Sequence, residues 1–135
     1  MANALYDKGR EGFLDGSIDW DTNTIKSILV DEGADTIDLA VDDNLDDRAA
    51  GSRISTSAAL TTKTVTNGVA DSDDITFTAV SGASVESVDF FKDTGTESTS
   101  RLICNVDTAT GLPVTPSGGD IVFRVDNGAN KLFKL

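Results

Sequence analysis

One helical period at the start of the chain gives way to shorter, strand-like periods. Over residues 3–15, apolar or small residues recur every three or four positions, which in a helix places them on one face: Ala2, Leu5, Tyr6, Gly9 and Phe13. Asn3 is suited to cap the start of this helix, and Gly16 is suited to end it. Gly9 and Gly12 each weaken a helix by about 1 kcal/mol relative to alanine. Their presence therefore predicts close packing against this face.

From residue 18 onward, apolar positions alternate with polar ones or form short runs, as in β-strands. We predict strands in residues 24–30, 53–60, 62–66, 75–80, 85–91, 100–106, 120–125 and 130–135. Gly, Asn, Asp and Ser separate these segments at short spacing, which is typical of a sandwich or barrel. The pattern predicts a mainly β fold, an antiparallel and jelly-roll-like β-sandwich with a short N-terminal helix.

Three connecting segments carry their own signals. Asn67-Gly68 is suited to a tight turn, and Asp126-Asn127-Gly128 predicts a hairpin between the last two strands. Residues 42–50 predict a short helical turn that ends at Gly51. A chain of 135 residues fits one domain, so we expect a single β-rich domain, with residues 1–16 as a helical arm and 17–135 as the sandwich.

The chain is strongly acidic, with 23 acids, 11 bases and a net charge of −12. Phosphate recognition needs clusters of Lys and Arg, so we expect neither nucleic acid nor an anionic membrane as a partner. No apolar run reaches the roughly 20 residues of a membrane span. The first residues lack the apolar core of a secretory signal, which predicts synthesis in the cytoplasm without ordinary export.

The residue types most used in catalysis are scarce. The chain has no histidine and one cysteine, Cys104, which lies in an apolar run and is expected to be a small buried hydrophobe. A serine triad therefore lacks its base, and the thiol lacks an activating partner. Two carboxylates could meet in a cleft, but among so many acids that possibility carries little weight. We predict a protein that is not an enzyme and needs no cofactor.

The acidic segment 31–47 holds eight acids and no base. Ca²⁺ takes six to eight oxygen ligands, so calcium binding is one interpretation of such a segment. The spacing does not match the calcium loop of an EF-hand. The other interpretation, which we prefer, is a solvated loop whose aspartates cap turns.

A few large apolar residues are candidates for contact with a partner. Trp20 lies between two aspartates and either anchors a partner or packs the N-terminal helix onto the sheet, which we prefer. Phe90 and Phe91 are neighbours in a predicted strand, so their side chains point to opposite faces. If one is in the core, the other is either covered by an accessory element or exposed to a partner. The interface candidates are Leu5, Tyr6, Phe13, Trp20 and Phe91.

Two stretches of the sequence carry a resemblance to a known group of proteins. The first runs through ALYDKGREGFL at 4–14 and IDW at 18–20; the second covers residues 93–96, 100–103, 107–116, 118–121 and 126–135. Together they resemble small virion structural proteins of tailed bacteriophages. The similarity runs nearly end to end and is weakest over residues 31–51. No catalytic motif belongs to this group, so it implies no site residue.

The resemblance implies a place in the virus particle. The first expectation is a capsid decoration, or cement, protein on the exterior of the capsid, which bridges subunits of the major capsid protein and self-associates as a homotrimer. The alternative is a receptor- or carbohydrate-binding β module on a tail fibre or baseplate. Copy number distinguishes the two, because cement proteins cover the shell and tail modules are few.

Overall fold

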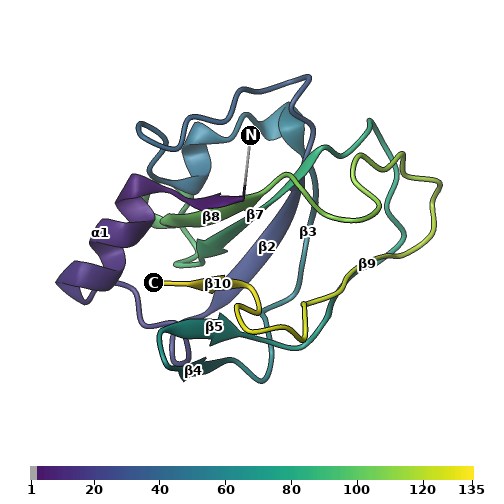
Figure 1. Cartoon of the computed structure of the whole chain (residues 1–135). Helices are drawn as coiled ribbons and strands as arrows, with labels where there is room; N and C mark the ends of the chain where they lie inside the picture. The colour runs from purple at the N-terminus through teal and green to yellow at the C-terminus, as the bar shows by residue number, and fades with distance from the viewer. Residues whose placement is uncertain (1–2) are drawn as a thin grey trace.

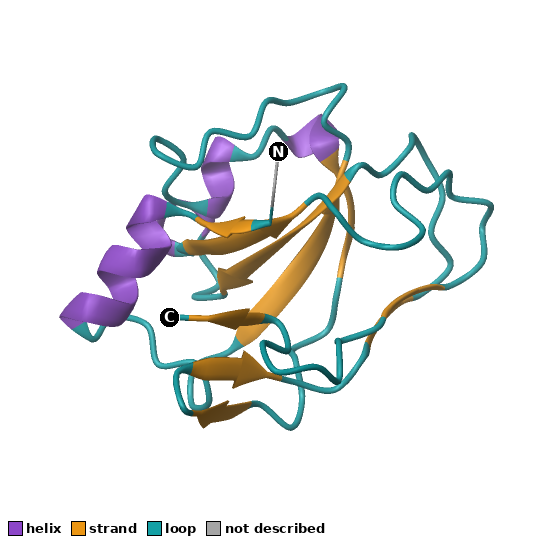
Figure 2. Cartoon of the chain, in the orientation of Figure 1, coloured by secondary structure: helices purple, strands orange, loops and turns teal. Residues whose placement is uncertain are grey.

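A computed structural model describes residues 3–135 and is mainly β, with antiparallel strands (Figure 1 and Figure 2). In chain order the elements are β1 (Ala4–Leu5), α1 (Asp7–Asp15), β2 (Ile25–Val30), η1 (Leu45–Asp47), η2 (Ala50–Ser52), β3 (Arg53–Thr56), β4 (Thr64–Thr66), β5 (Val69–Asp71), β6 (Ile75–Phe77), β7 (Ser87–Lys92), η3 (Glu97–Thr99), β8 (Leu102–Val106), β9 (Ile121–Phe123) and β10 (Phe133–Lys134). The three η elements are single turns of 3-10 helix.

The largest sheet has five strands in the order β1-β8-β7-β2-β3. Its centre is the antiparallel pair β2 and β7, which runs in register from Ile25 opposite Lys92 to Val30 opposite Ser87. The remaining strands form two smaller sheets, β10-β5-β4 and β6-β9. The sheets form an open, sandwich-like arrangement, which confirms the predicted fold class; each of the eight predicted strand segments overlaps an observed strand.

The main core lies between the five-stranded sheet and the two small sheets. Ile25, Leu29 and Phe90 point into it from the large sheet, and Ala70 and Phe77 come from the small ones. The ring of Phe90 also meets Phe123 of β9 edge to face, with 5.6 Å between ring centroids. Since the strands of the large sheet alternate, their remaining apolar residues point to the opposite face.

That opposite face is covered by residues 31–52, which we call the 31–52 loop and which carry η1 and η2 (Figure 1). A second core forms beneath it, where Ile37 from the loop packs on Ile28, Val30 and Phe91 of the sheet. Both faces of β2 and β7 are therefore buried, which explains why their sequences are apolar on both faces.

The N-terminal helix is shorter than predicted, because it begins at Asp7. Residues Ala4 and Leu5 instead pair with β8 as strand β1, and Asn3 does not cap the helix: its side-chain oxygen accepts hydrogen bonds from the backbone N–H groups of residues 107 and 108. Gly16 ends the helix in the left-handed conformation, as predicted. Ala2 lies outside the described residues. Gly9 lies so close to β8 that a Cβ would stand 2.6 Å from the carbonyl oxygen of Ile103, which confirms the close packing.

The turn predictions had mixed outcomes. Asn67 and Gly68 both have positive φ and connect β4 to β5, a strand that the sequence analysis missed. Residues 42–50 contain the predicted helical turn as η1, but Gly51 lies inside η2 and does not end it. The predicted hairpin at 126–128 is wrong, because β9 pairs with β6 and β10 pairs with β5.

Candidate functional site

Most of the predicted interface residues lie inside the domain. Phe91 is only 1% exposed and belongs to the second core, so the prediction that it faces a partner is wrong. The reason is the 31–52 loop, which covers the face of the sheet to which Phe91 points. Phe90 is buried on the other face, so neither phenylalanine reaches the surface.

Leu5 and Tyr6 are likewise used within the fold. Leu5 pairs with Cys104 of β8 and belongs to the main core. Tyr6 is fully buried, and its hydroxyl donates a hydrogen bond of 2.7 Å to Asp89. The structure therefore leaves neither side chain open to a partner.

Phe13 and Trp20 come together around Phe133 near the C-terminal end of the chain. The ring centroid of Phe133 lies 5.8 Å from that of Phe13 and 5.2 Å from that of Trp20, which it meets edge to face. The indole Nε1 of Trp20 donates a hydrogen bond of 3.0 Å to the carbonyl oxygen of Asp71. Trp20 thus packs the segment after α1 onto the small sheet, close to its preferred sequence interpretation.

These aromatic residues line an open groove between α1 and the sheet β10-β5-β4, with a volume of about 290 Å³. We call it the groove; its lining residues are Phe13, Gly16, Ile18, Asp19, Trp20, Val65, Gly68, Ala70, Phe133 and Leu135. Trp20, Ile18 and Ala70 are buried, whereas Val65 is 54% exposed and Leu135 is 59% exposed. The groove therefore has an apolar lining with large apolar side chains still open to solvent.

Among the described residues that line the groove, Asp19 is the single one with a charged side chain. A proton shared with the Asp21 carboxyl group and a hydrogen bond from Thr22 lower the pKa of Asp19 below its usual range, so the Asp19 carboxylate is charged at neutral pH. The groove thus combines apolar walls with one negative charge. Such a surface fits an apolar side chain that has a basic neighbour.

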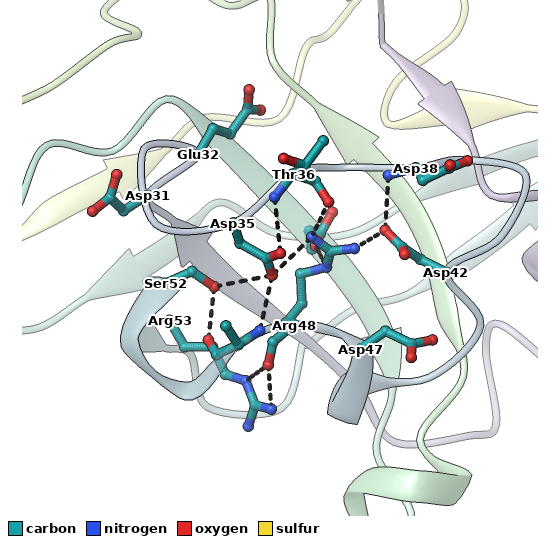
Figure 3. A network of polar contacts seen from close by, with 12 residues as sticks. Asp31, Glu32, Asp35, Thr36, Asp38, Asp42, Asp47, Arg48, Ser52 and Arg53 are labelled. Atoms are coloured by element: carbon teal, nitrogen blue, oxygen red, sulfur yellow. Dashed lines mark hydrogen bonds and ion pairs between the residues drawn. The ribbon is translucent and has the colours of Figure 1, made fainter.

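A second candidate lies under the 31–52 loop, where Arg48 is fully buried (Figure 3). One guanidinium nitrogen lies 3.1 Å from a carboxylate oxygen of Asp35, another forms an ion pair with Asp42, and Nε lies 3.5 Å from Asp89. Asp35 also accepts hydrogen bonds from the backbone N–H groups of Thr36 and Ala49. The arrangement ties the two ends of the loop to the sheet beneath it.

Asp89 connects this arginine to the rest of the buried polar network. Its carboxylate accepts hydrogen bonds from the Tyr6 hydroxyl and from the Asn105 amide at 2.7 and 2.9 Å. Burial raises the pKa of Asp89 to about 6, against hydrogen bonds and the Arg48 charge that lower it. Burial, together with the charge of Asp89, also raises the pKa of Tyr6. Arg48, Asp89, Tyr6 and Asn105 are all fully buried, so the network connects the 31–52 loop to the sheet from inside the fold.

Neither Arg48 nor Asp89 was predicted from the sequence. The acidic segment was defined as ending at Asp47, one residue before the arginine that balances it. The available signal for Asp89 is its position between Val88 and Phe90, because an acid inside an apolar strand needs a buried partner. The long-range ion pair itself has no local pattern.

Two further groups of side chains are relevant to metal binding or catalysis. The carboxylates of Asp43, Asp46 and Asp47 lie within 4.8 Å of one another near the surface, a spacing that can hold a cation. The backbone N–H groups of Asp43 and Asn44 already donate hydrogen bonds to Asp47, as in a capped turn. Burial raises the pKa of the Cys104 thiol, so this cysteine is protonated at neutral pH and is not an activated nucleophile.

No protein-family model matches the chain, and no curated protein matches it. Across residues 3–135, no helix is both long and apolar enough to cross a lipid bilayer.

Proposed function

We propose that this chain is a non-enzymatic structural protein of a tailed-bacteriophage virion, most specifically a capsid decoration protein that binds and stabilises the major capsid protein. The observation that carries this proposal is the groove, an apolar surface with exposed Val65 and Leu135 on an otherwise acidic domain. An apolar groove with exposed apolar residues at its edge supports a role in binding another macromolecule.

The buried titratable groups support a role without catalysis or a cofactor. Asp89, Tyr6 and Cys104 have the most strongly raised pKa values, and all three are enclosed within the domain. A catalytic acid or base must reach a substrate, and shifted pKa values also arise from structural ion pairs. Here burial within the fold raises the pKa of Asp89, and the ion pair with Arg48 only opposes that shift.

The resemblance of the two ends of the chain to small virion proteins supports a place in the particle. In a cement protein the mechanism is mechanical: each copy binds two or more shell subunits, and many modest contacts together oppose the pressure of packaged DNA. We include self-association as a homotrimer and a position on the capsid exterior in the proposal. The net charge of −12 fits such a position, because it limits non-specific adhesion.

The alternative is a receptor- or carbohydrate-binding module of a tail fibre or baseplate. Carbohydrate recognition commonly uses exposed aromatic faces, whereas Trp20 and Tyr6 are buried. This observation favours the cement proposal over the alternative. Both proposals describe a virion protein, so they differ in where the chain is found and in how many copies.

The copy number of the chain in purified particles tests the proposal directly. Quantitative mass spectrometry of particles from the phage that encodes it should give a ratio to the major capsid protein near one, or near a simple fraction. A ratio of a few copies per hundred major capsid proteins would contradict the cement proposal and favour the tail module. Absence of the chain from washed particles would contradict both.

A further inference from the structure

The outermost strand of the small sheet has an unpaired edge. In the order β10-β5-β4, strand β4 has a neighbour on one side only within residues 3–135, and Thr64, Val65 and Thr66 are all exposed. Figure 1 shows β4 as the outer strand of this sheet. Thr66 and Val69 flank the two-residue turn and are paired, so their hydrogen bonds point inward. The N–H and C=O groups of Val65 therefore point outward, away from β5.

This edge is continuous with the groove. Ala70 lies opposite Val65 on one side and opposite Phe133 on the other, so these three side chains share one face of the sheet. The same face lines the groove. A strand added beside β4 would therefore place one of its side chains next to Val65, over the groove.

The charge of the groove limits what such a strand can be. Asp19 carries a negative charge beside the apolar lining, within a chain of net charge −12. A second copy of this chain would bring the same excess of negative charge to the contact. A segment with a large apolar side chain and a neighbouring Lys or Arg instead complements both the lining and Asp19.

We propose that an extended segment of the major capsid protein adds as a strand to the free edge of β4 and inserts a large apolar side chain into the groove. A Lys or Arg of the same segment pairs with Asp19. Backbone hydrogen bonds to Val65 supply part of the affinity, and the groove selects the side chain, as in other cases of strand addition. This inference rests on the proposed function, since it names the part of the shell protein that the chain recognises.

Single substitutions at the groove test the proposal. Val65→Asp places a charge at the apolar edge, and Val122→Asp is its matched control, because Val122 is 43% exposed at the centre of the three-residue strand β9. Asp19→Asn removes the charge, with Asp46→Asn on the 31–52 loop as control. Because Val65 and Val122 are both exposed, we expect both variants to keep the melting temperature of the wild-type protein.

The measurement is co-sedimentation with shells assembled from the major capsid protein alone, at several salt concentrations. We expect Val65→Asp to weaken binding by about tenfold or more, the size typical of a residue central to an interface. Asp19→Asn should weaken binding less and reduce its salt dependence. Both control variants should bind as the wild-type protein does.

Two results would overturn the inference while leaving the proposed function intact. One is equal binding of Val65→Asp and wild-type protein to shells. The other is loss of self-association in Val65→Asp, measured by light scattering, which would assign the groove to another copy of the chain. Failure of the wild-type protein to bind shells, with a low copy number in particles, would instead contradict the proposed function itself.

Discussion

Arg48 is a buried basic residue that several acidic side chains contact. It contacts carboxylates from two parts of the 31–52 loop, Asp35 and Asp42, and from the sheet, Asp89. Arg48 lies between the loop and the sheet, so its side chain connects residues that are far apart in the sequence. Breaking a buried ion pair leaves uncompensated charge, which costs about 3–5 kcal/mol.

We therefore expect Arg48→Met to lower the free energy of unfolding by roughly 3 kcal/mol or more. The methionine keeps part of the side-chain volume but leaves three carboxylates without their counter-charge. Urea denaturation measures the change. Arg124→Met is the control, because the Arg124 side chain is 80% exposed and its change should stay within about 0.5 kcal/mol. A comparable loss in both variants would contradict the role of Arg48.

The raised pKa of Asp89 predicts how the stability of the protein depends on pH. Its pKa is about 6 in the folded protein and near the usual 3.8 in the unfolded chain. The folded state therefore holds this proton more tightly, and the stability that protonated Asp89 contributes is complete below pH 4 and is lost as pH rises through 6. Each unit of pKa difference corresponds to about 1.4 kcal/mol.

The measurement compares wild-type protein with Asp89→Asn, whose amide does not titrate. The difference in unfolding free energy, wild type minus variant, should fall as pH rises from about 4 to 7. Other acids with lowered pKa values, such as Asp73 and Asp93, are present in both proteins and cancel in the difference. A difference that stays constant or rises over this range would contradict the buried state of Asp89.

At the scale of elements, strands with local alternation were predictable and elements made by distant pairing were not. The apolar positions of β2, β7 and β8 identify them as strands wherever they lie in the fold. Residues 4–5 fit the helical period, yet pairing with β8 makes them a strand. The Asn127-Gly128 pair has hairpin character, but β10 pairs with β5 and packs Phe133 on Trp20 instead. In both cases tertiary contacts overrode the local preference.

The candidate site also has residues that could be predicted from the sequence and residues that could not. Phe13 and Trp20 were predicted as interface residues, and both line the groove. Their partners in the lining, Val65 and Phe133, are separated from them by more of the chain than any local pattern covers. Phe91 was chosen as the exposed member of the Phe90-Phe91 pair, whereas the 31–52 loop covers the face of the sheet to which Phe91 points. A loop without periodicity gives no signal that it packs on a sheet.

In helix α1, helix propensity and packing predict opposite changes in stability for the same substitution. Propensity alone predicts that Gly9→Ala stabilises the protein by about 1 kcal/mol. The structure predicts the opposite, because the new Cβ would meet backbone carbonyl oxygens of β8 at 2.6 and 2.9 Å. We expect Gly9→Ala to lower the free energy of unfolding, measured by urea titration, by about 1–3 kcal/mol, the usual range for overpacking.

Gly51→Ala provides the control for this substitution. Its Cβ would meet nothing within 4 Å, and its φ is not positive. We expect a change within about 0.5 kcal/mol. If Gly9→Ala proved as stable as Gly51→Ala or more so, the close contact between α1 and β8 would be incorrect.

For the whole molecule, the dominant electrostatic feature is the excess of acids, with 23 acids against 11 bases and a net charge of −12. Charges of one sign on a compact domain repel one another and destabilise it, and salt screens that repulsion. Two kinds of cation effect are therefore possible: screening of the whole surface and binding at the Asp43, Asp46 and Asp47 cluster. They differ in whether the identity of the cation matters.

We expect screening to dominate, since hydrogen bonds from the backbone at Asp43 and Asn44 already stabilise the Asp47 carboxylate in a capped turn. The melting temperature should rise with NaCl, and CaCl₂ at the same ionic strength should raise it equally. Differential scanning calorimetry of the wild-type protein and Asp46→Asn makes the comparison. A larger rise with calcium, lost in Asp46→Asn, would contradict this expectation and make the cluster a cation site on the exposed side of the 31–52 loop.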